Sequence, residues 1–460
     1  MCDLAYETKN GWLSADETTK KEIFDLCDDY KNYLNEGRTE RLACAEAVRR
    51  AKEAGFCDLT SKDGLKPGDK VYMINRDKSV YLAVIGEEDI EKGINFVIAH
   101  IDSPRMDLKQ NPLYEDSDMT LFKTHYYGGI KKYQWTATPL ALAGVVYTKD
   151  GKKVDIRIGD RAGDPVFCVT DLLPHLADGQ MQKKATQIIE GENLNILIGS
   201  IPDSDSEKDA FKTAMLKLLN EKYGISEEDF ISAELEAYPA APATDVGFDR
   251  SMVGGYGQDD RVCAYAALEA VLKVDSCKKT AVCVLVDKEE IGSMGNTGMR
   301  SAFFEFATAN IIKKIKGTYD ELMIKTAFRN SECLSSDVNA AVDPNYPEVN
   351  EKKNASFLGR GIVMTKYTGA RGKSGTSDAN AEFVYKVRKL FNDNNIVWQS
   401  SELGKVDAGG GGTIAQYVAN LDMEVIDCGV ALLSMHAPFE IASKLDIYMA
   451  YKAYLAFYNN

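Results

Sequence analysis

Two of the chain's four histidines follow apolar runs, a position from which a side chain can serve a metal site. His100 closes the run NFVIA, and His436 follows VALLSM. Asp102 lies two residues beyond His100 and therefore points to the same face of an extended strand. Its carboxylate can accept the second imidazole N–H of a metal-bound histidine. Taken alone, His100 and His436 are equally consistent with structural histidines in the core or at a helix end.

Carboxylates occur in three further motifs. VCVLVDKEEIGSMG places Glu289 and Glu290 after an apolar strand, and because neighbouring side chains diverge, one can bind a metal while the other faces a substrate. In GYGQDDRVCAYAALEA, a helix N-cap role explains one of Asp259 and Asp260 but not both. Asp337 follows a short apolar segment in SECLSSDVNAAVDPNYPEVN. Each motif by itself also fits a solvated loop or a turn.

Counted together, these residues suit a pair of metal ions. Two histidines and three carboxylates fit a site in which one carboxylate bridges two divalent ions about 3.5–4 Å apart, as in two-metal hydrolases. Such ions prefer mixed imidazole and carboxylate ligands. The chain has no HExxH motif, which excludes the common one-zinc protease arrangement.

The elements that must position these residues follow an α/β pattern. Residues 15–35 and 41–55 carry apolar side chains at helical spacing, and three strands follow at KVYMINR, SVYLAVIG and INFVIAHID. His100 falls at the carboxyl end of a strand buried on both faces, the edge where open α/β sheets bind ligands. The alternation resumes after residue 245: a helix from Asp260 to about Val274, a strand at TAVCVLVD, a helix near 378–391, a strand at EVIDCG and a closing helix at 441–458. We expect a mixed sheet flanked by helices.

Residues 107–245 have a different composition. They are rich in glycine, threonine and aromatic residues, with a polar helical stretch near 204–222. We interpret them as a β-rich domain inserted into a catalytic domain formed by residues 1–106 and 246–460. We expect this inserted domain to mediate self-association, because its exposed aromatic side chains are poorly explained as a linker.

Composition excludes several classes of protein. A formal charge of −15 opposes binding to nucleic acid and to anionic membrane surfaces. No signal peptide opens the sequence, and no apolar run approaches the roughly 18 residues of a membrane span, so we expect a cytoplasmic protein. The ten cysteines form no CxxC pair, which indicates neither disulfides nor a cysteine-rich metal site.

The motifs AHIDSPR, the Asp-Asp pair before a helix, VDKEEIGS, SSDVNAAVDPNYPE and LSMHAPFE resemble those of the aspartyl aminopeptidase family of di-zinc exopeptidases. Their order and spacing match over nearly the whole chain. The resemblance implies a zinc-exopeptidase fold of the bacterial type, with two ions that are zinc, or cobalt or manganese in its place. It implies that Asp259 bridges the ions, that His100 and Asp337 complete one shell and that Glu290 and His436 complete the other. It also implies that Glu289 is the general base, and the HxD spacing adds Asp102 as the partner of His100.

The resemblance also implies an activity and an assembly. The enzyme would remove an acidic or neutral amino-terminal residue from peptides, and would form a homo-oligomer built from dimers, such as a dodecamer, through the inserted β-rich domain. Two departures leave the substrate preference open. Ala340 and Asp343 stand where the family carries histidines, and Asp260 stands where asparagine usually follows the bridging aspartate.

Candidates for substrate binding lie further along the chain. The basic residues Lys366, Arg371 and Lys373 are candidates for an acidic side chain or the peptide carboxylate. The backbone N–H groups near Gly410 and Gly411 are candidates for close approach to the substrate. The alternative for the cations is a solvated basic loop.

Two other functions have some support in the sequence. GARGKSGTS imitates the phosphate-binding loop of an ATPase, but Tyr367 stands where that loop needs its first glycine, and the acidic strand precedes the loop instead of following it. An acidic scaffold without activity leaves unexplained why carboxylates follow buried strands.

Overall fold

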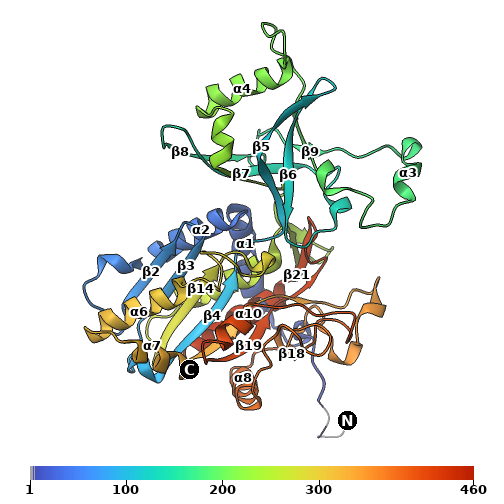
Figure 1. The fold of residues 1–460 in the computed structure, drawn as a ribbon. Helices are drawn as coiled ribbons and strands as arrows, with labels where there is room; N and C mark the ends of the chain where they lie inside the picture. The colour runs from blue at the N-terminus through green and yellow to red at the C-terminus, as the bar shows by residue number, and fades with distance from the viewer. Residues whose placement is uncertain (1–3, 5) are drawn as a thin grey trace. The chain divides into compact units, whose positions relative to one another are not determined.

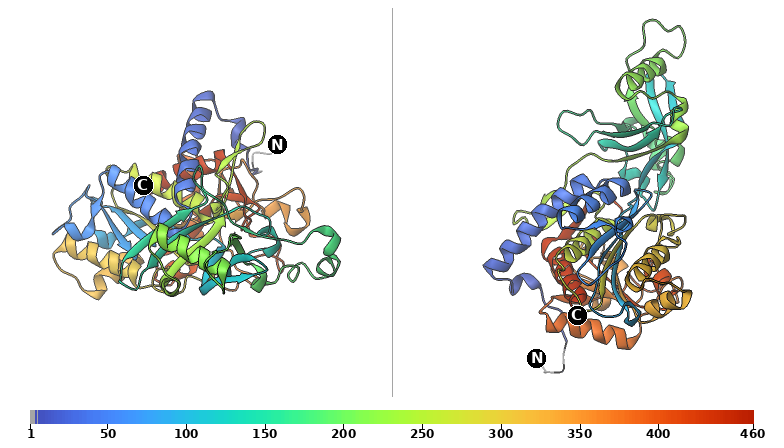
Figure 2. Two further views of the ribbon diagram at one scale, coloured as in Figure 1. Left: turned by 90° about the horizontal axis from the view of Figure 1, so that it is seen from above. Right: turned by 90° about the vertical axis from the view of Figure 1, so that its left-hand side faces the viewer.

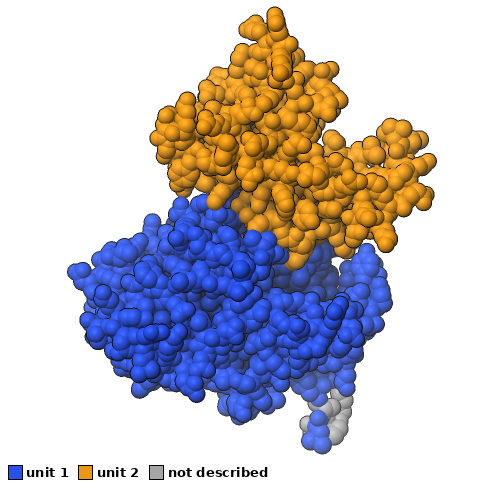
Figure 3. All heavy atoms as spheres, viewed as in Figure 1, with its two compact units in different colours: residues 1–102, 243–435, 440–460 blue, residues 103–242, 436–439 orange. Residues whose placement is uncertain are grey.

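The computed structural model describes residue 4 and residues 6–460. Two compact units divide the chain (Figure 3). The first comprises the described residues up to Asp102 together with residues 243–435 and 440–460, and the second comprises residues 103–242 and 436–439. The predicted insertion had bounds of 107 and 245.

A nine-stranded mixed sheet forms the centre of the first unit, in the order β1-β2-β3-β14-β4-β15-β19-β17-β18 (Figure 1). β14, β4, β15 and β19 are parallel neighbours. All residues of β4 and β14 are buried, as expected for apolar strands covered on both faces. The strands are β1 (Cys57–Asp58), β2 (Lys70–Asn75), β3 (Ser79–Val84), β4 (Ile94–His100), β14 (Thr280–Val286), β15 (Glu332–Ser335), β17 (Ile362–Thr365), β18 (Trp398–Ser400) and β19 (Glu424–Gly429).

The register of this sheet brings the predicted site together. His100, the last residue of β4, pairs with Val286, the last residue of β14. Because the two strands are parallel, the loop that carries Glu289 and Glu290 begins at the same edge as His100. Asp337 follows β15, the other parallel neighbour of β4, at that edge as well.

Helices cover both faces of the sheet (Figure 2). Side chains alternate along a strand, so neighbouring residues of β4 face opposite sides of the sheet. Val97 packs against one set of helices, and Phe96 and Ile98 pack against the set on the other face. The first set is α1 (Glu17–Glu36), α2 (Glu40–Glu53), α5 (Gln258–Leu272), α8 (Ala381–Asp393) and α10 (Lys444–Tyr458). The second set is α6 (Phe303–Lys316), α7 (Glu321–Arg329) and α9 (Ala415–Ala419).

A five-stranded sheet, which the sequence did not predict, completes the first unit in the order β12-β13-β21-β20-β16. Its strands are three or four residues long, apart from a two-residue β16, so they give no clear alternation. They are β12 (Thr244–Val246), β13 (Met252–Gly255), β16 (Asn339–Ala340), β20 (Ala431–Leu433) and β21 (Glu440–Ser443).

The second unit contains a seven-stranded antiparallel sheet, in the order β8-β7-β11-β5-β6-β10-β9. Its strands are β5 (Arg105–Asp116), β6 (Met119–Tyr127), β7 (Leu140–Tyr147), β8 (Lys153–Ile158), β9 (Cys168–Val169), β10 (Ile196–Gly199) and β11 (Ala233–Pro239), and its helices are α3 (Asp178–Met181) and α4 (Ala210–Tyr223). Among the described residues of the whole chain, no helix combines the length and apolar character needed to cross a membrane.

Candidate metal centre

His100 has its two ring nitrogens in different surroundings. Nδ1 lies 3.0 Å from the backbone oxygen of Asp102 and 3.3 Å from its Oδ1. Both oxygens accept when the carboxylate is ionised, so Nδ1 carries the proton and donates. Nε2 lies 3.2 Å from Asp259 Oδ1 and 3.9 Å from Asp337 Oδ1. Nε2 therefore faces two carboxylates, where it carries either a proton or a metal ion, and this is the orientation that a metal-binding histidine requires.

Asp259 and Asp260 lie in the first turn of α5, and both have non-helical backbone angles. The N-cap of α5 is Gly257, so the alternative of an N-cap aspartate does not describe the start of this element. The peptide bond between them is cis. Asp260 is fully buried and its Oδ2 accepts the backbone N–H of His100 at 3.3 Å. Asp260 therefore holds the end of β4 close to Asp259.

Glu440 is a buried residue of the site that sequence reasoning missed. Its Oε2 accepts the N–H of Gln258 at 2.6 Å and that of Asp259 at 3.1 Å, and only 1% of Glu440 is exposed. Because it binds the backbone of Asp259 itself, Glu440 determines where that carboxylate lies. Glu440 is the last residue of the motif LSMHAPFE, and this position was the one feature of the sequence that could have pointed to it.

His100, Asp259 and Asp337 each offer one ligand atom, and these atoms lie within 4.8 Å of one another. Burial, reinforced by Glu289, raises the pKa of Asp337 well above its usual value. Burial alone would lower the pKa of His100, but Asp102 and Asp259 outweigh it and raise that pKa well above 6.5. Nearby carboxylates contribute to both shifts, in addition to burial at Asp337, because they outnumber the nearby positive charges. A divalent cation would supply that charge, and imidazole with carboxylates is a donor set that zinc accepts.

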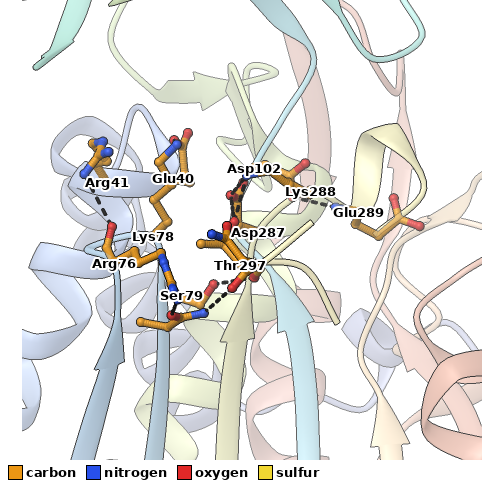
Figure 4. A network of polar contacts seen from close by, with 12 residues as sticks. Glu40, Arg41, Arg76, Lys78, Ser79, Asp102, Asp287, Lys288, Glu289 and Thr297 are labelled. Carbon is orange, nitrogen blue, oxygen red and sulfur yellow. Dashed lines mark hydrogen bonds and ion pairs between the residues drawn. The ribbon is translucent and has the colours of Figure 1, made fainter. Parts of the chain in front are cut away.

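Glu289 and Glu290 begin a short 3-10 helix after β14. The carboxylate of Asp102 binds both of their backbone amides. Its Oδ1 accepts from Glu289 at 3.1 Å (Figure 4), and its Oδ2 accepts from Glu290 at 3.2 Å. Glu289 Oε2 lies 3.8 Å from His100 Nε2. Asp102 thus holds the loop of the two glutamates as well as the ring of His100.

His436 belongs to the short segment 436–439 of the second unit. It has a positive φ of 64°, and its Nδ1 lies 2.8 Å from the carbonyl oxygen of Gly129. A side chain at Gly129 would come within 3.3 Å of that nitrogen, so glycine makes room for the contact. As in His100, a backbone oxygen engages Nδ1, and Nε2 is the ring atom suited to a metal.

The predicted substrate residues lie in loops after β17 and before α9. Lys373 pairs with Asp378 at 2.7 Å, and Lys366 lies 3.9 Å from the same aspartate. A side chain on Gly410 would collide with the backbone of Ala370. The N–H of Gly411 donates to the carbonyl oxygen of Thr368 at 3.0 Å, so this amide is engaged within the chain here.

Comparison with known proteins supplies the class of enzyme. The family model described as aminopeptidase I zinc metalloprotease (M18) matches residues 33–458. A probable M18 family aminopeptidase 1 of Clostridium acetobutylicum is 55% identical over 463 residues, covering 100% of this chain and 99% of that protein. A crystal structure of an M18 aminopeptidase from Thermotoga maritima has 46% identity and a TM-score of 0.96, covering 99% of this chain and 100% of its own. The structure of aminopeptidase I from C. acetobutylicum has 51% identity and a TM-score of 0.92, with the same coverage.

The mixed α/β sheet carries buried imidazole and carboxylate groups that could hold a metal ion at its carboxyl edge, and its structural relatives are metallo-aminopeptidases. The chain belongs to the M18 family of aminopeptidases. It is a zinc metallo-aminopeptidase, a hydrolase acting on peptide bonds, and this confirms the enzyme class expected from the motifs.

Proposed function

We propose that this aminopeptidase uses two metal ions bridged by Asp259. The observation that carries the proposal is the convergence of His100 Nε2, Asp259 and Asp337 at the carboxyl edge of the sheet. These three residues would hold the first ion. Asp259, Glu290 and His436 would hold the second. Zinc is the expected metal, with cobalt or manganese as substitutes.

The assignment of the second ion has separate support. The amide of Glu290 is fixed by Asp102, and Nδ1 of His436 is fixed by Gly129. His436 also lies shortly before Glu440 in the chain, and Glu440 binds the backbone of Asp259.

Each residue has a distinct part in peptide hydrolysis. When bound, the zinc ions supply Lewis-acid chemistry that polarises the scissile carbonyl and makes water easier to deprotonate. Glu289 accepts the proton that the attacking water loses and returns it to the leaving amine, a role worth about 10² to 10⁴ in rate. Asp102 holds Glu289 through its backbone amide, so the base does not have to be ordered during the reaction.

The amino-terminal residue of the substrate is proposed to be acidic or neutral. Lys366 and Lys373 share Asp378, whereas no ion pair involves Arg371 within the described part of the chain. Arg371 is therefore the strongest candidate of the three for an acidic side chain or a peptide carboxylate. The alternative remains a solvated basic loop.

The second unit is proposed to form the dimers from which a homo-oligomer is built. Yeast mApe1, which is 19% identical to this chain and shares its fold with a TM-score of 0.76, is a dodecamer. We propose an assembly of that kind here, in the cytoplasm. The described cysteines are all free thiols, as suits a reducing compartment.

Elemental analysis and a panel of aminoacyl chromogenic substrates test the proposal. We expect about two transition-metal ions per chain, activity on amino-terminal residues, and loss of that activity with a chelator. Full activity after exhaustive chelation, with no metal left, would refute the two-metal site. Magnesium bound together with nucleotide would favour the ATPase alternative, and absence of both metal and activity would favour a scaffold.

A further inference from the structure

The chain leaves β14 through a sharp turn at Lys288. Lys288 has a φ of 68°, in the left-handed region that a residue with a side chain occupies only where its surroundings hold it. Its carbonyl oxygen accepts the N–H of Ser293 at 2.7 Å, and that of Glu289 accepts the N–H of Gly292 at 2.9 Å. The turn sets the direction in which Glu289 leaves the strand. Whatever holds Lys288 therefore positions Glu289 as well.

The side chains of Asp287, Lys288 and Thr297 join the two ends of this loop. We call these three residues the 287–288–297 triangle. Lys288 Nζ donates to Asp287 Oδ2 and to Thr297 Oγ1, each at 2.7 Å, and the Thr297 hydroxyl donates to the same Asp287 oxygen at 2.6 Å. The N–H of Asp287 donates to the carbonyl of Thr297 at 3.3 Å. Ser79 Oγ donates to that carbonyl at 2.7 Å, which ties Thr297 to the start of β3 (Figure 4).

Two members of the triangle are buried, and the Lys288 side chain is partly exposed. Asp287 is 1% exposed and Thr297 is 3% exposed. The loop also closes over the stem of Lys288, since a side chain on Gly295 would come within 3.3 Å of its Cδ. A buried carboxylate is tolerated only where it is paired and hydrogen-bonded. Asp287 therefore fixes the Lys288 ammonium and the Thr297 hydroxyl in one arrangement.

We propose that the 287–288–297 triangle is a positioning device for Glu289. It holds the turn at Lys288, while Asp102 binds the backbone amides of Glu289 and Glu290. Together these contacts restrict tilting of the loop that carries the Glu289 carboxylate. The inference rests on the proposed role of Glu289 as general base and adds residues that do not touch the substrate themselves.

Thr297 offers a matched pair of variants for the test. Thr297→Val keeps the shape of the side chain but removes the hydroxyl, whereas Thr297→Ser keeps the hydroxyl. We expect kcat to fall about tenfold or more in Thr297→Val, since a displacement of about 1 Å near the reacting groups costs up to 10²-fold. KM and zinc content should stay near wild type, and Thr297→Ser should recover most of kcat.

A double variant shows whether the effect passes through Glu289. In a Glu289→Gln background the loss caused by Thr297→Val should disappear, because residues that act as one unit are not additive. An undiminished loss in that background, loss of zinc, or a lower melting temperature with unchanged kcat would each overturn the proposal. If Glu289→Gln is itself fully active, the proposed base fails instead, and the two failures are thereby distinguished.

Lys288 provides a second pair should Thr297→Val not fold. Lys288→Met removes the ammonium and Lys288→Arg retains a cation. We expect the same pattern, with kcat reduced in Lys288→Met and largely recovered in Lys288→Arg at unchanged zinc content. Equal kcat in wild type and Lys288→Met would overturn the proposal.

Discussion

The carboxylate of Asp102 accepts the backbone N–H of Glu289 at 3.1 Å, across a separation of 187 residues in sequence. The same carboxylate faces Nδ1 of His100 at 3.3 Å and is fully buried. A single side chain therefore couples the proposed metal ligand at the end of β4 to the proposed general base after β14. The supporting role expected for Asp102 from the HxD spacing covers only half of these contacts.

Asp102→Asn tests this coupling. An asparagine offers one acceptor oxygen, and its NH₂ group would face an N–H that Asp102 now accepts. We expect metal affinity or activity to fall by about 10 to 100-fold, the usual effect of removing a partner of a metal-binding histidine. Zinc titration and steady-state kinetics measure the two effects. The exposed Asp63→Asn is the control, and identical behaviour of the two variants would contradict the assigned role.

Glu440→Ala tests whether the backbone of Asp259 must be held in place. The variant leaves the buried N–H groups of Gln258 and Asp259 without this acceptor, at a cost of about 1–3 kcal/mol for each unsatisfied group. We expect a lower melting temperature and weaker zinc binding. Glu440→Gln, whose amide oxygen can accept the same two bonds, should lie between the alanine variant and wild type. Normal zinc content and kcat in Glu440→Ala would exclude Glu440 from the site.

Local sequence patterns were enough to locate the strand ends that carry the site. The apolar runs before His100 and Glu289 predicted buried strands, and parallel pairing of those strands brings both residues to one edge. Glu440 could not be found in this way, because its contact with Asp259 spans 181 residues and involves backbone amides that leave no trace in the sequence. An N-cap role accounted for only one of Asp259 and Asp260, and the second role, a bond from Asp260 to the backbone of His100, is long-range and has no local pattern.

Two further features could not be predicted from the sequence: the five-stranded sheet, and the close contact between Gly410 and the backbone of Ala370. Strands as short as β20 and β21 have too few residues to show a period of two, and they are held by their neighbours in the sheet. Gly410 looked suited to close approach by a substrate. The group that approaches it is the backbone of Ala370, and only the folded chain shows which partner makes that approach.

Substrate preference can be tested at Arg371. If its guanidinium contacts an acidic amino-terminal side chain, Arg371→Gln should lower kcat/KM for aspartyl and glutamyl substrates and leave leucyl substrates nearly unchanged. Lys373→Gln serves as the matched variant, because Lys373 already pairs with Asp378, and it should have the smaller effect. Unchanged kcat/KM for all three substrates after replacement of Lys366, Arg371 and Lys373 together would remove these residues from the pocket.

Glu289 and Glu290 are chemically identical neighbours whose amides are both bound by Asp102, so their different proposed roles give the most discriminating test. Glu289→Gln removes the group that accepts a proton and should leave the ligands of both ions in place. We expect it to retain about two metals per chain and to bind substrate, while kcat falls by about 10² to 10⁴.

Glu290→Gln should behave differently, because a neutral amide is a weaker metal ligand than a carboxylate. We expect one ion to bind less tightly and activity to recover in part when zinc, cobalt or manganese is added. Elemental analysis of both variants, followed by kinetics across a metal titration, separates loss of the base from loss of an ion. The same metal content and the same rescue in both variants would show that the division of roles is wrong, even though the enzyme class stands.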